Sequence, residues 1–219
     1  MTRLIATDRL QITVVAGTYI SEELVRLVGG MKYQGIRGLG WPLSRLLAQA
    51  VLGHAPCQQM VSGITAVPLH WQRRLERGFN QAAILGRLLA QQVGLPYLPN
   101  VLRRVRATAQ QARIAAADPR RQTNVRYAFQ AREPATDEPR DLLLVDDLIT
   151  SGATILGVGE ALAEAGWRVG WGVAAGLARS VETGSELTGR RVITRNPAGR
   201  RETTLTRCGG VSRMGPPTS

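Results

Sequence analysis

The sequence predicts an α/β fold in which helices flank an open, mainly parallel, twisted sheet. Three neighbouring segments carry this prediction: an apolar run at 142–145, a helix-like stretch at 153–166, and a second apolar run at 167–178. Such runs are typical of strands that are buried on both faces, as parallel sheets require. Strand, helix and strand in succession form a βαβ unit, and several such units build a doubly wound sheet.

Residues 1–60 are predicted to form a small helical part that packs on the core. Two helices are expected there, over 21–30 and 41–53. The first opens with a serine and two acidic residues and closes on a glycine pair, a pattern of helix start and stop. The second has a proline in its first turn, and a glycine-punctuated stretch connects the two.

The main domain is predicted over 61–186. Strands are expected at 63–70, 97–102, 124–130, 142–145 and 167–178, and helices at 82–95 and 153–166. Segment 103–124 has no sustained apolar period, and so long a connection inside a compact domain is usually functional or disordered. The polar, proline-bearing stretch 131–141 is expected to be a loop.

Charge along the chain is strongly basic. The formal net charge of +12 comes almost entirely from arginine, since Lys32 is the only lysine. This balance favours polyanionic partners, namely nucleic acid, phosphorylated substrates or acidic surfaces, without choosing between them. Segment 187–219, with seven arginines and one acidic residue, is expected to be a disordered tail, and the sharper interpretation is a nucleic-acid-binding arm.

Cysteine and histidine content argues against a zinc site. The two cysteines, Cys57 and Cys208, and the two histidines, His54 and His70, do not have the spacing of metal ligands or of a disulfide framework. No apolar window reaches the roughly 18 residues that a membrane span needs, and the first residues contain no signal-peptide core. A cytoplasmic protein without membrane contact is therefore expected.

The most informative stretch is 142–155, where the acidic pair Asp146-Asp147 follows the apolar run and precedes a hydroxyl-rich turn. Ligands of open α/β sheets bind beyond the carboxyl ends of the strands. The unpaired amides at the start of the next helix favour an anion, and a glycine lets the backbone approach it. Carboxylates instead suit hydrogen-bond donors such as vicinal sugar hydroxyls. These features predict a site for a ribose 5-phosphate group; the alternative is a solvated acidic turn that caps a helix.

Other phosphate-binding motifs do not fit this stretch. A P-loop requires Gly-Lys-Ser/Thr, and no lysine is near. A dinucleotide fingerprint requires G-x-G-x-x-G, which Gly152, Gly157 and Gly159 do not match. Leu148 excludes a phosphatase motif of the D-x-D type.

The stretch LLLVDDLITSGAT resembles the ribose-phosphate-binding signature of type I phosphoribosyltransferases. The segment VPLHWQRRLERGFNQA at 67–82 resembles the signature of one branch, the ComF family, as do RRVRATAQQ, RRQTNVRYAF and MKYQG. The resemblance covers about residues 19–180. It implies a type I phosphoribosyltransferase-like fold that binds 5-phosphoribosyl 1-diphosphate with Mg²⁺. The implied reaction transfers the phosphoribosyl group to a nitrogen nucleophile and releases pyrophosphate.

The resemblance also implies a role for each matching residue. Asp146 and Asp147 would be catalytic residues that bind the ribose hydroxyls and hold the metal indirectly, through those hydroxyls or water. The 5-phosphate would lie against Thr150, Ser151, Gly152, Ala153 and Thr154. The pyrophosphate would face His70, Arg73, Arg74, Arg77 and Gly78. Segment 103–124 would be a mobile flap that excludes water, with Arg104 and Arg106 as catalytic residues and Arg103 and Arg113 beside them.

Several of these residues have simpler interpretations. The arginines of the flap are also what a solvated basic loop contains. Asn80 and Gln81 are equally suited to begin a helix, and His70 to end a strand with backbone partners. Cys57 is interpreted as a packing residue.

Two functions from different classes stay open on the sequence. The first is catalysis with 5-phosphoribosyl 1-diphosphate. The second is a non-catalytic ComF-type accessory role in DNA uptake or natural transformation, with nucleotide, single-stranded DNA or competence proteins as partners, since fold alone does not establish catalysis. A homodimer is compatible with both. Many relatives carry an N-terminal four-cysteine zinc module whose cysteines this sequence lacks, and no acceptor pocket can be recognised.

Overall fold

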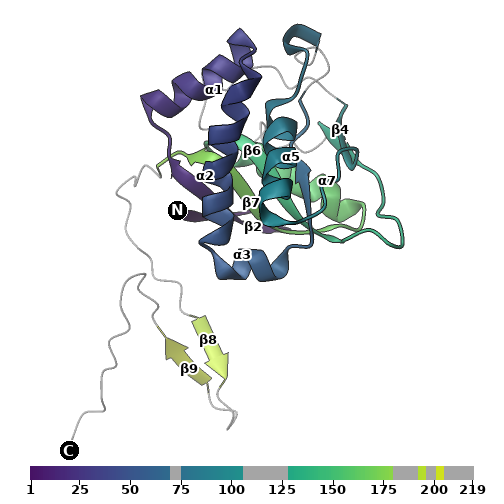
Figure 1. Ribbon diagram of the computed structural model, residues 1–219. Coiled ribbons are helices and arrows are strands. Elements are labelled where there is room, and N and C mark those ends of the chain that lie inside the picture. Colours follow the sequence, from purple (N-terminus) through teal and green to yellow (C-terminus); the bar gives the residue numbers. More distant parts are fainter. Residues whose placement is uncertain (70–74, 106–127, 180–191, 196–200, 205–219) are drawn as a thin grey trace, which may run out of the picture. The chain divides into compact units, whose positions relative to one another are not determined.

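The computed structural model describes residues 1–69, 75–105 and 128–179, together with the backbone of two short strands at 192–195 and 201–204 (Figure 1). The chain divides into two compact units, Met1–Arg179 and Ser180–Ser219. The first unit contains both the predicted helical part and most of the predicted main domain.

A five-stranded sheet forms the centre of the first unit. Its strands, in spatial order, are β1 (Thr2–Ala6), β2 (Gln11–Tyr19), β7 (Arg168–Leu177), β6 (Asp141–Ile149) and β3 (Gly63–Ala66). β1 pairs antiparallel with β2, and every other neighbouring pair is parallel. A separate antiparallel pair consists of β4 (Leu102–Arg104) and β5 (Phe129–Ala131). The predicted mixed α/β fold with a mostly parallel sheet is confirmed.

Helices cover both faces of this sheet (Figure 1). They are α1 (Glu22–Gln34), the short 3-10 helix η1 (Arg37–Leu39), α2 (Gly40–Leu52), α3 (Ala55–Met60), α5 (Gln81–Val93) and α7 (Ala153–Glu164). Successive strand side chains point to opposite faces, so Leu143 and Val145 of β6 pack with α1, α2 and α5. Leu142 and Leu144 instead pack with α7 and the β4–β5 pair. β6 is therefore buried on both sides, as its apolar run predicts.

The first 19 residues form strands β1 and β2, where only a helical part was expected. β2 was missed because it lies between β1 and β7 with both faces covered, and so shows little polar alternation to recognise. α1 also runs past Gly29-Gly30, where it was expected to stop, and ends at Gly35, whose φ of 68° is left-handed. A side chain at Gly30 would meet Leu39, so close packing keeps this glycine inside the helix.

The other predicted elements agree better with the structure. Ser21 caps α1 by accepting a hydrogen bond from the Leu24 amide, and Pro42 lies in the first turn of α2. The predicted strand at 97–102 is reduced to one bridge between Tyr97 and Ile64, followed by β4. The predicted strand at 124–130 is described only from Ala128 onward, where β5 begins at the next residue.

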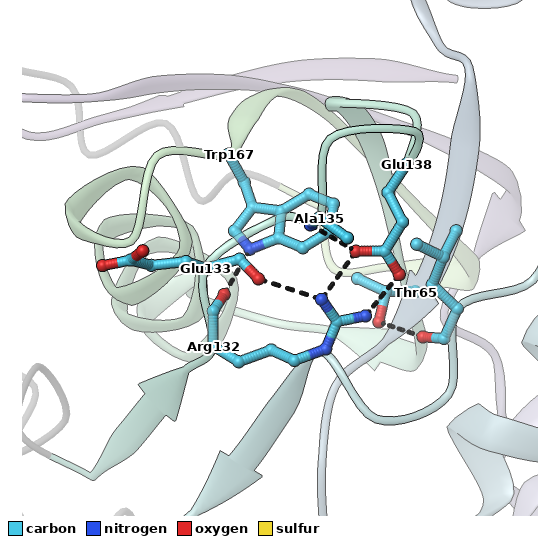
Figure 2. A network of polar contacts seen from close by, with 7 residues as sticks. Thr65, Arg132, Glu133, Ala135, Glu138 and Trp167 are labelled. Carbon is cyan, nitrogen blue, oxygen red and sulfur yellow. Dashed lines mark hydrogen bonds and ion pairs between the residues drawn. The ribbon is translucent and has the colours of Figure 1, made fainter.

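The loop before β6 is held by a polar network around Trp167 (Figure 2). Arg132 donates to both carboxylate oxygens of Glu138, at 2.6 and 2.5 Å, and lies over the Trp167 ring. The Trp167 indole N–H donates to the Arg132 carbonyl oxygen at 2.6 Å. Hydrogen bonds from the Arg132 guanidinium, and then from the Ala135 amide, lower the pKa of Glu138 to about 2. The network orders the loop that leads into the amino end of β6, the end away from the acidic pair.

Gly17 of β2 packs closely against α2. A methyl group on Gly17 would lie 2.7 Å from Leu46 Cβ and 2.8 Å from the Leu46 carbonyl oxygen, neither of which can rotate away. We expect Gly17→Ala to lower the free energy of unfolding by about 2–3 kcal/mol in urea denaturation. Gly170→Ala on β7 is the matched control, because nothing lies within 4 Å of its added methyl group. Equal effects of the two substitutions would contradict this packing.

In the second unit the structure describes two short antiparallel strands, β8 (Val192–Arg195) and β9 (Arg201–Thr204). Apart from these two strands, the predicted tail at 187–219 lies outside the described residues. In the part of the chain that the structure describes, none of the helices has the length and apolar character needed to cross a bilayer.

Candidate functional site

The acidic pair lies inside β6, with Asp147 two residues before the strand ends at Ile149. β3 pairs with β6 only as far as Val145, whose carbonyl oxygen also accepts the Val67 amide at 2.9 Å. On the other side, β7 continues to pair with β6 as far as Ile149. Among the described residues, β6 beyond Val145 therefore has a strand partner on one edge only. The strand was expected to end at Val145, before the acidic pair; it instead extends to Ile149, because β7 continues to pair with it.

Asp147 is buried, with 7% of its surface exposed. Its Oδ1 accepts a hydrogen bond from Lys32 Nζ at 2.8 Å, so the carboxylate faces α1. Burying a carboxylate without a partner is costly, and Lys32 supplies the compensating charge. The sequence offered only a weak signal for this pair: Lys32 is the single lysine and lies in the quoted MKYQG segment.

Asp146 has a different environment. Alternation along the strand directs it toward the opposite face from Asp147, and its Oδ1 accepts a hydrogen bond from the Asp147 amide at 2.8 Å. Desolvation, and then the charge of Asp147, raise the pKa of Asp146 to about 7, against the smaller lowering effects of that hydrogen bond and of Lys32 and Arg104. The two carboxyl groups therefore differ, because Asp147 has a counter-ion, whereas burial and the charge of Asp147 raise the pKa of Asp146.

The hydroxyl-rich turn connects β6 to α7. Thr150 and Ser151 are exposed, and Gly152 adopts a left-handed conformation with φ of 85° before the helix begins at Ala153. The far side of the turn is packed, since a methyl group on Gly152 would lie 2.3 Å from Ile5 Cδ1. The turn therefore packs against β1 on one side, and its Thr150 and Ser151 side chains are exposed on the other.

Arg3 is a residue beside the turn that sequence reasoning missed. Its guanidinium donates to the Thr150 carbonyl oxygen and, at 3.3 Å, to the Ala178 carbonyl oxygen. It thus ties the ends of β6 and β7 together and brings a positive charge near the turn. The sequence near Arg3 does not indicate this role, because the role depends on the pairing of β1 in the sheet, which was not predicted.

The predicted pyrophosphate loop is described only at its end. Arg77 lies over the Tyr33 ring at 5.1 Å and donates to Gln81 Oε1 at 3.3 Å, and Gly78 has a left-handed φ of 71°. Asn80 caps α5 by accepting from the Ala82 amide, which supports its interpretation as a helix start. His70, Arg73 and Arg74 lie outside the described residues.

The predicted flap is described only at its beginning. Arg104 lies over the Phe129 ring at 5.3 Å, on the pair of strands beside the acidic pair, and is close enough to lower the pKa of Asp146. Arg103 instead binds Gln130 Oε1 across the β4–β5 pair. Arg106 and Arg113 fall outside the part of the chain that is described.

A metal ion would find few protein ligands here. Within the described ranges, no group of three or more His, Cys, Asp or Glu side chains could hold one. Asp147 is paired with Lys32, and within the described ranges Asp146 forms no ion pair. These residues fit Mg²⁺ only if the phosphates of a bound ligand and water molecules supply most of the metal's ligands.

Two further features lie apart from the acidic pair. Cys57, interpreted as a packing residue, is buried in the α1, α2 and α5 layer, and burial raises the pKa of its thiol to about 12. A cavity of about 280 Å³ lies between β2 and α2, and none of the predicted site residues lines it. Neither feature contributes to the chemistry of the pair.

Comparison with known proteins assigns the family. Competence protein F of Haemophilus influenzae is 34% identical to this chain over 156 residues, which cover 70% of this chain and 67% of that protein. The chain belongs to the ComF family. DNA utilization protein YhgH is 33% identical over 138 residues in Salmonella typhimurium and 34% identical over 140 residues in Escherichia coli. In both cases the match covers 62% of this ComF-family chain and 59% of the relative.

Other comparisons add little to this family assignment. No protein-family model matches the chain. A crystal structure from Thermus thermophilus covers 66% of this chain and 84% of that one, with 16% identity and a TM-score of 0.33, a similarity too low to support a fold assignment.

Proposed function

We propose that this ComF-family protein binds 5-phosphoribosyl 1-diphosphate at the carboxyl end of β6 and transfers the phosphoribosyl group to a nitrogen nucleophile. The observation that carries the proposal is the direct succession of two unlike carboxyl groups and an open hydroxyl-rich turn at a helix start. Such a start favours an anion, so the 5-phosphate would lie at residues 150–154. The ribose hydroxyls would approach along the edge of β6 that β3 leaves unpaired.

The type I phosphoribosyltransferase-like fold is part of this proposal. The mostly parallel sheet and the position of the acidic pair are compatible with it. The resemblance of the sequence motifs to that family gives the proposal further support.

The proposed chemistry breaks the bond between ribose C1 and the diphosphate oxygen and forms a bond between C1 and nitrogen. The diphosphate leaves with the electron pair, and the nitrogen loses a proton. Negative charge develops on the leaving group, where preorganised cations stabilise it. Among the described residues, Arg77 and Arg104 are the proposed cations for this role. Mg²⁺, held by the diphosphate and through water by Asp146, would supply further charge neutralisation.

Calorimetry with 5-phosphoribosyl 1-diphosphate and Mg²⁺ tests ligand binding. We expect Asp146→Asn/Asp147→Asn to weaken binding by about 100-fold, since each carboxylate that accepts a hydroxyl contributes a charge-assisted hydrogen bond. Asp141→Asn is the matched control, because Asp141 lies at the other end of β6 and pairs with Arg168 at the surface. Equal heats in the wild type and the double variant would remove the proposed site.

A non-catalytic role in DNA uptake is the second candidate. It is favoured by the names of the relatives, one a competence protein and the others DNA utilization proteins. The discriminating assay measures pyrophosphate release across a panel of nucleobases and amines. Silence with every acceptor, together with intact ligand binding, would favour the accessory role.

For that accessory role, the basic tail is the proposed contact to single-stranded DNA. We expect truncation after Gly184 to weaken oligonucleotide binding and to reduce the dependence of affinity on salt, because phosphate contacts release counter-ions. An unchanged affinity with an unchanged salt slope would exclude the tail as a nucleic-acid-binding arm.

A further inference from the structure

Lys32, in the MKYQG segment, contacts the acidic pair from the end of α1. It lies in the last turn of α1, and its ammonium group reaches across to Asp147 on β6. An ammonium group has three N–H donors, and among the described residues its one hydrogen bond is to Asp147. Two of its N–H donors therefore have no partner among the described residues.

The surroundings of Lys32 connect two parts of the proposed site. The next residue, Tyr33, is 76% exposed and lies under the guanidinium of Arg77. Arg77 belongs to the segment that follows β3, where the diphosphate is expected. The end of α1 therefore lies between the acidic pair and that segment, and Lys32 is the residue that contacts the acidic pair.

We propose that Lys32 is a ligand-binding residue whose ammonium group contacts the diphosphate on C1 of the sugar while it stays paired with Asp147. The inference rests on the proposed function and adds a cation contributed by α1. A carboxylate has room for a ribose hydroxyl as well as for Lys32. Asp147 would thus orient both the sugar and the cation that binds its leaving group.

The single lysine makes this inference directly testable in the wild-type protein. Acetylation by an amine-reactive ester, followed by mass spectrometry of Lys32, reports its accessibility, and the α-amino group serves as the internal reference. We expect 5-phosphoribosyl 1-diphosphate with Mg²⁺ to slow acetylation of Lys32 by about tenfold, in line with a charge-assisted contact. Ribose 5-phosphate, which lacks the diphosphate, should leave the rate within about twofold of the free protein.

Calorimetry on variants gives an independent readout. Lys32→Met should weaken binding of 5-phosphoribosyl 1-diphosphate by about tenfold or more and binding of ribose 5-phosphate far less. Lys32→Arg, which keeps the charge, should recover part of the loss. A thermal melt of each variant identifies any that has lost its fold, and the labelling experiment does not depend on them.

The outcomes separate this inference from the proposed function. If the wild type binds neither ligand, the proposed function fails and the inference fails with it. If the wild type binds the diphosphate compound but Lys32 acetylation is unchanged or faster, the ligand does not contact Lys32 and only the inference fails. Equal losses for both ligands in Lys32→Met would also overturn it, because the effect would then come from Asp147.

Discussion

Lys32→Met should lower the free energy of unfolding by roughly 3 kcal/mol at pH 7, measured by urea denaturation of the ligand-free protein. The reason is the burial of Asp147, whose carboxylate would lose its partner at 2.8 Å and remain in a water-poor environment. Lys32→Met/Asp147→Asn should recover most of the loss, because the second change removes the uncompensated charge.

The surface pair Arg26–Glu22 provides the control for this prediction. Both side chains are largely exposed, at 72% and 89%, and exposed pairs of this kind contribute little. Arg26→Met should therefore change the free energy of unfolding by less than about 0.5 kcal/mol. If Lys32→Met costs no more than Arg26→Met, the buried ion pair does not have the role described.

Asp146→Asn should stabilise the ligand-free protein at pH 8. The pKa of Asp146 is raised to about 7 in the folded state, so between its ordinary pKa and about 7 the folded state binds more protons than the unfolded state. Stability contributed by this group is therefore greatest below about pH 4 and is lost as the pH rises through 7. An asparagine does not ionise and escapes this loss, and we expect a gain on the order of 2 kcal/mol at pH 8 that is small near pH 4.

Asp141→Asn should have the opposite sign. Its hydrogen bond and charge interaction with Arg168 lower the pKa of Asp141, so its contribution to stability is present above its ordinary pKa and is lost as the pH falls. Denaturation curves of both variants between pH 4 and pH 8 make the comparison. A loss of stability in Asp146→Asn at pH 8 would show that its carboxylate is well solvated or compensated by another group.

The sequence predicted the strand, turn and helix around the acidic pair because each depends on local chemistry. An apolar run specifies a buried strand, and a glycine with hydroxyl neighbours specifies a tight turn before a helix. These features require no knowledge of distant residues. Helices α2 and α5 were predicted in the same way, from start and stop signals that are also local.

The parts of the site that the sequence did not predict depend on contacts between residues far apart in the chain. Lys32 and Asp147 are 115 positions apart, and Arg3 is 147 positions from Thr150. β1 and β2 were missed for a related reason, since β2 is covered on both faces and shows little polar alternation, and β1 pairs only with β2. The roles of His70, Arg73, Arg74 and Arg106 stay predictions, because these residues lie outside the described ranges.

The central claim is that a sugar phosphate binds at the turn that connects β6 to α7. A crystal structure of the complex with 5-phosphoribosyl 1-diphosphate tests it most directly. We expect the 5-phosphate within hydrogen-bond distance of the amides at 151–154 and the ribose hydroxyls at Asp146 and Asp147. A ligand bound elsewhere on the chain, with the turn empty and the Lys32–Asp147 pair undisturbed, would contradict the claim.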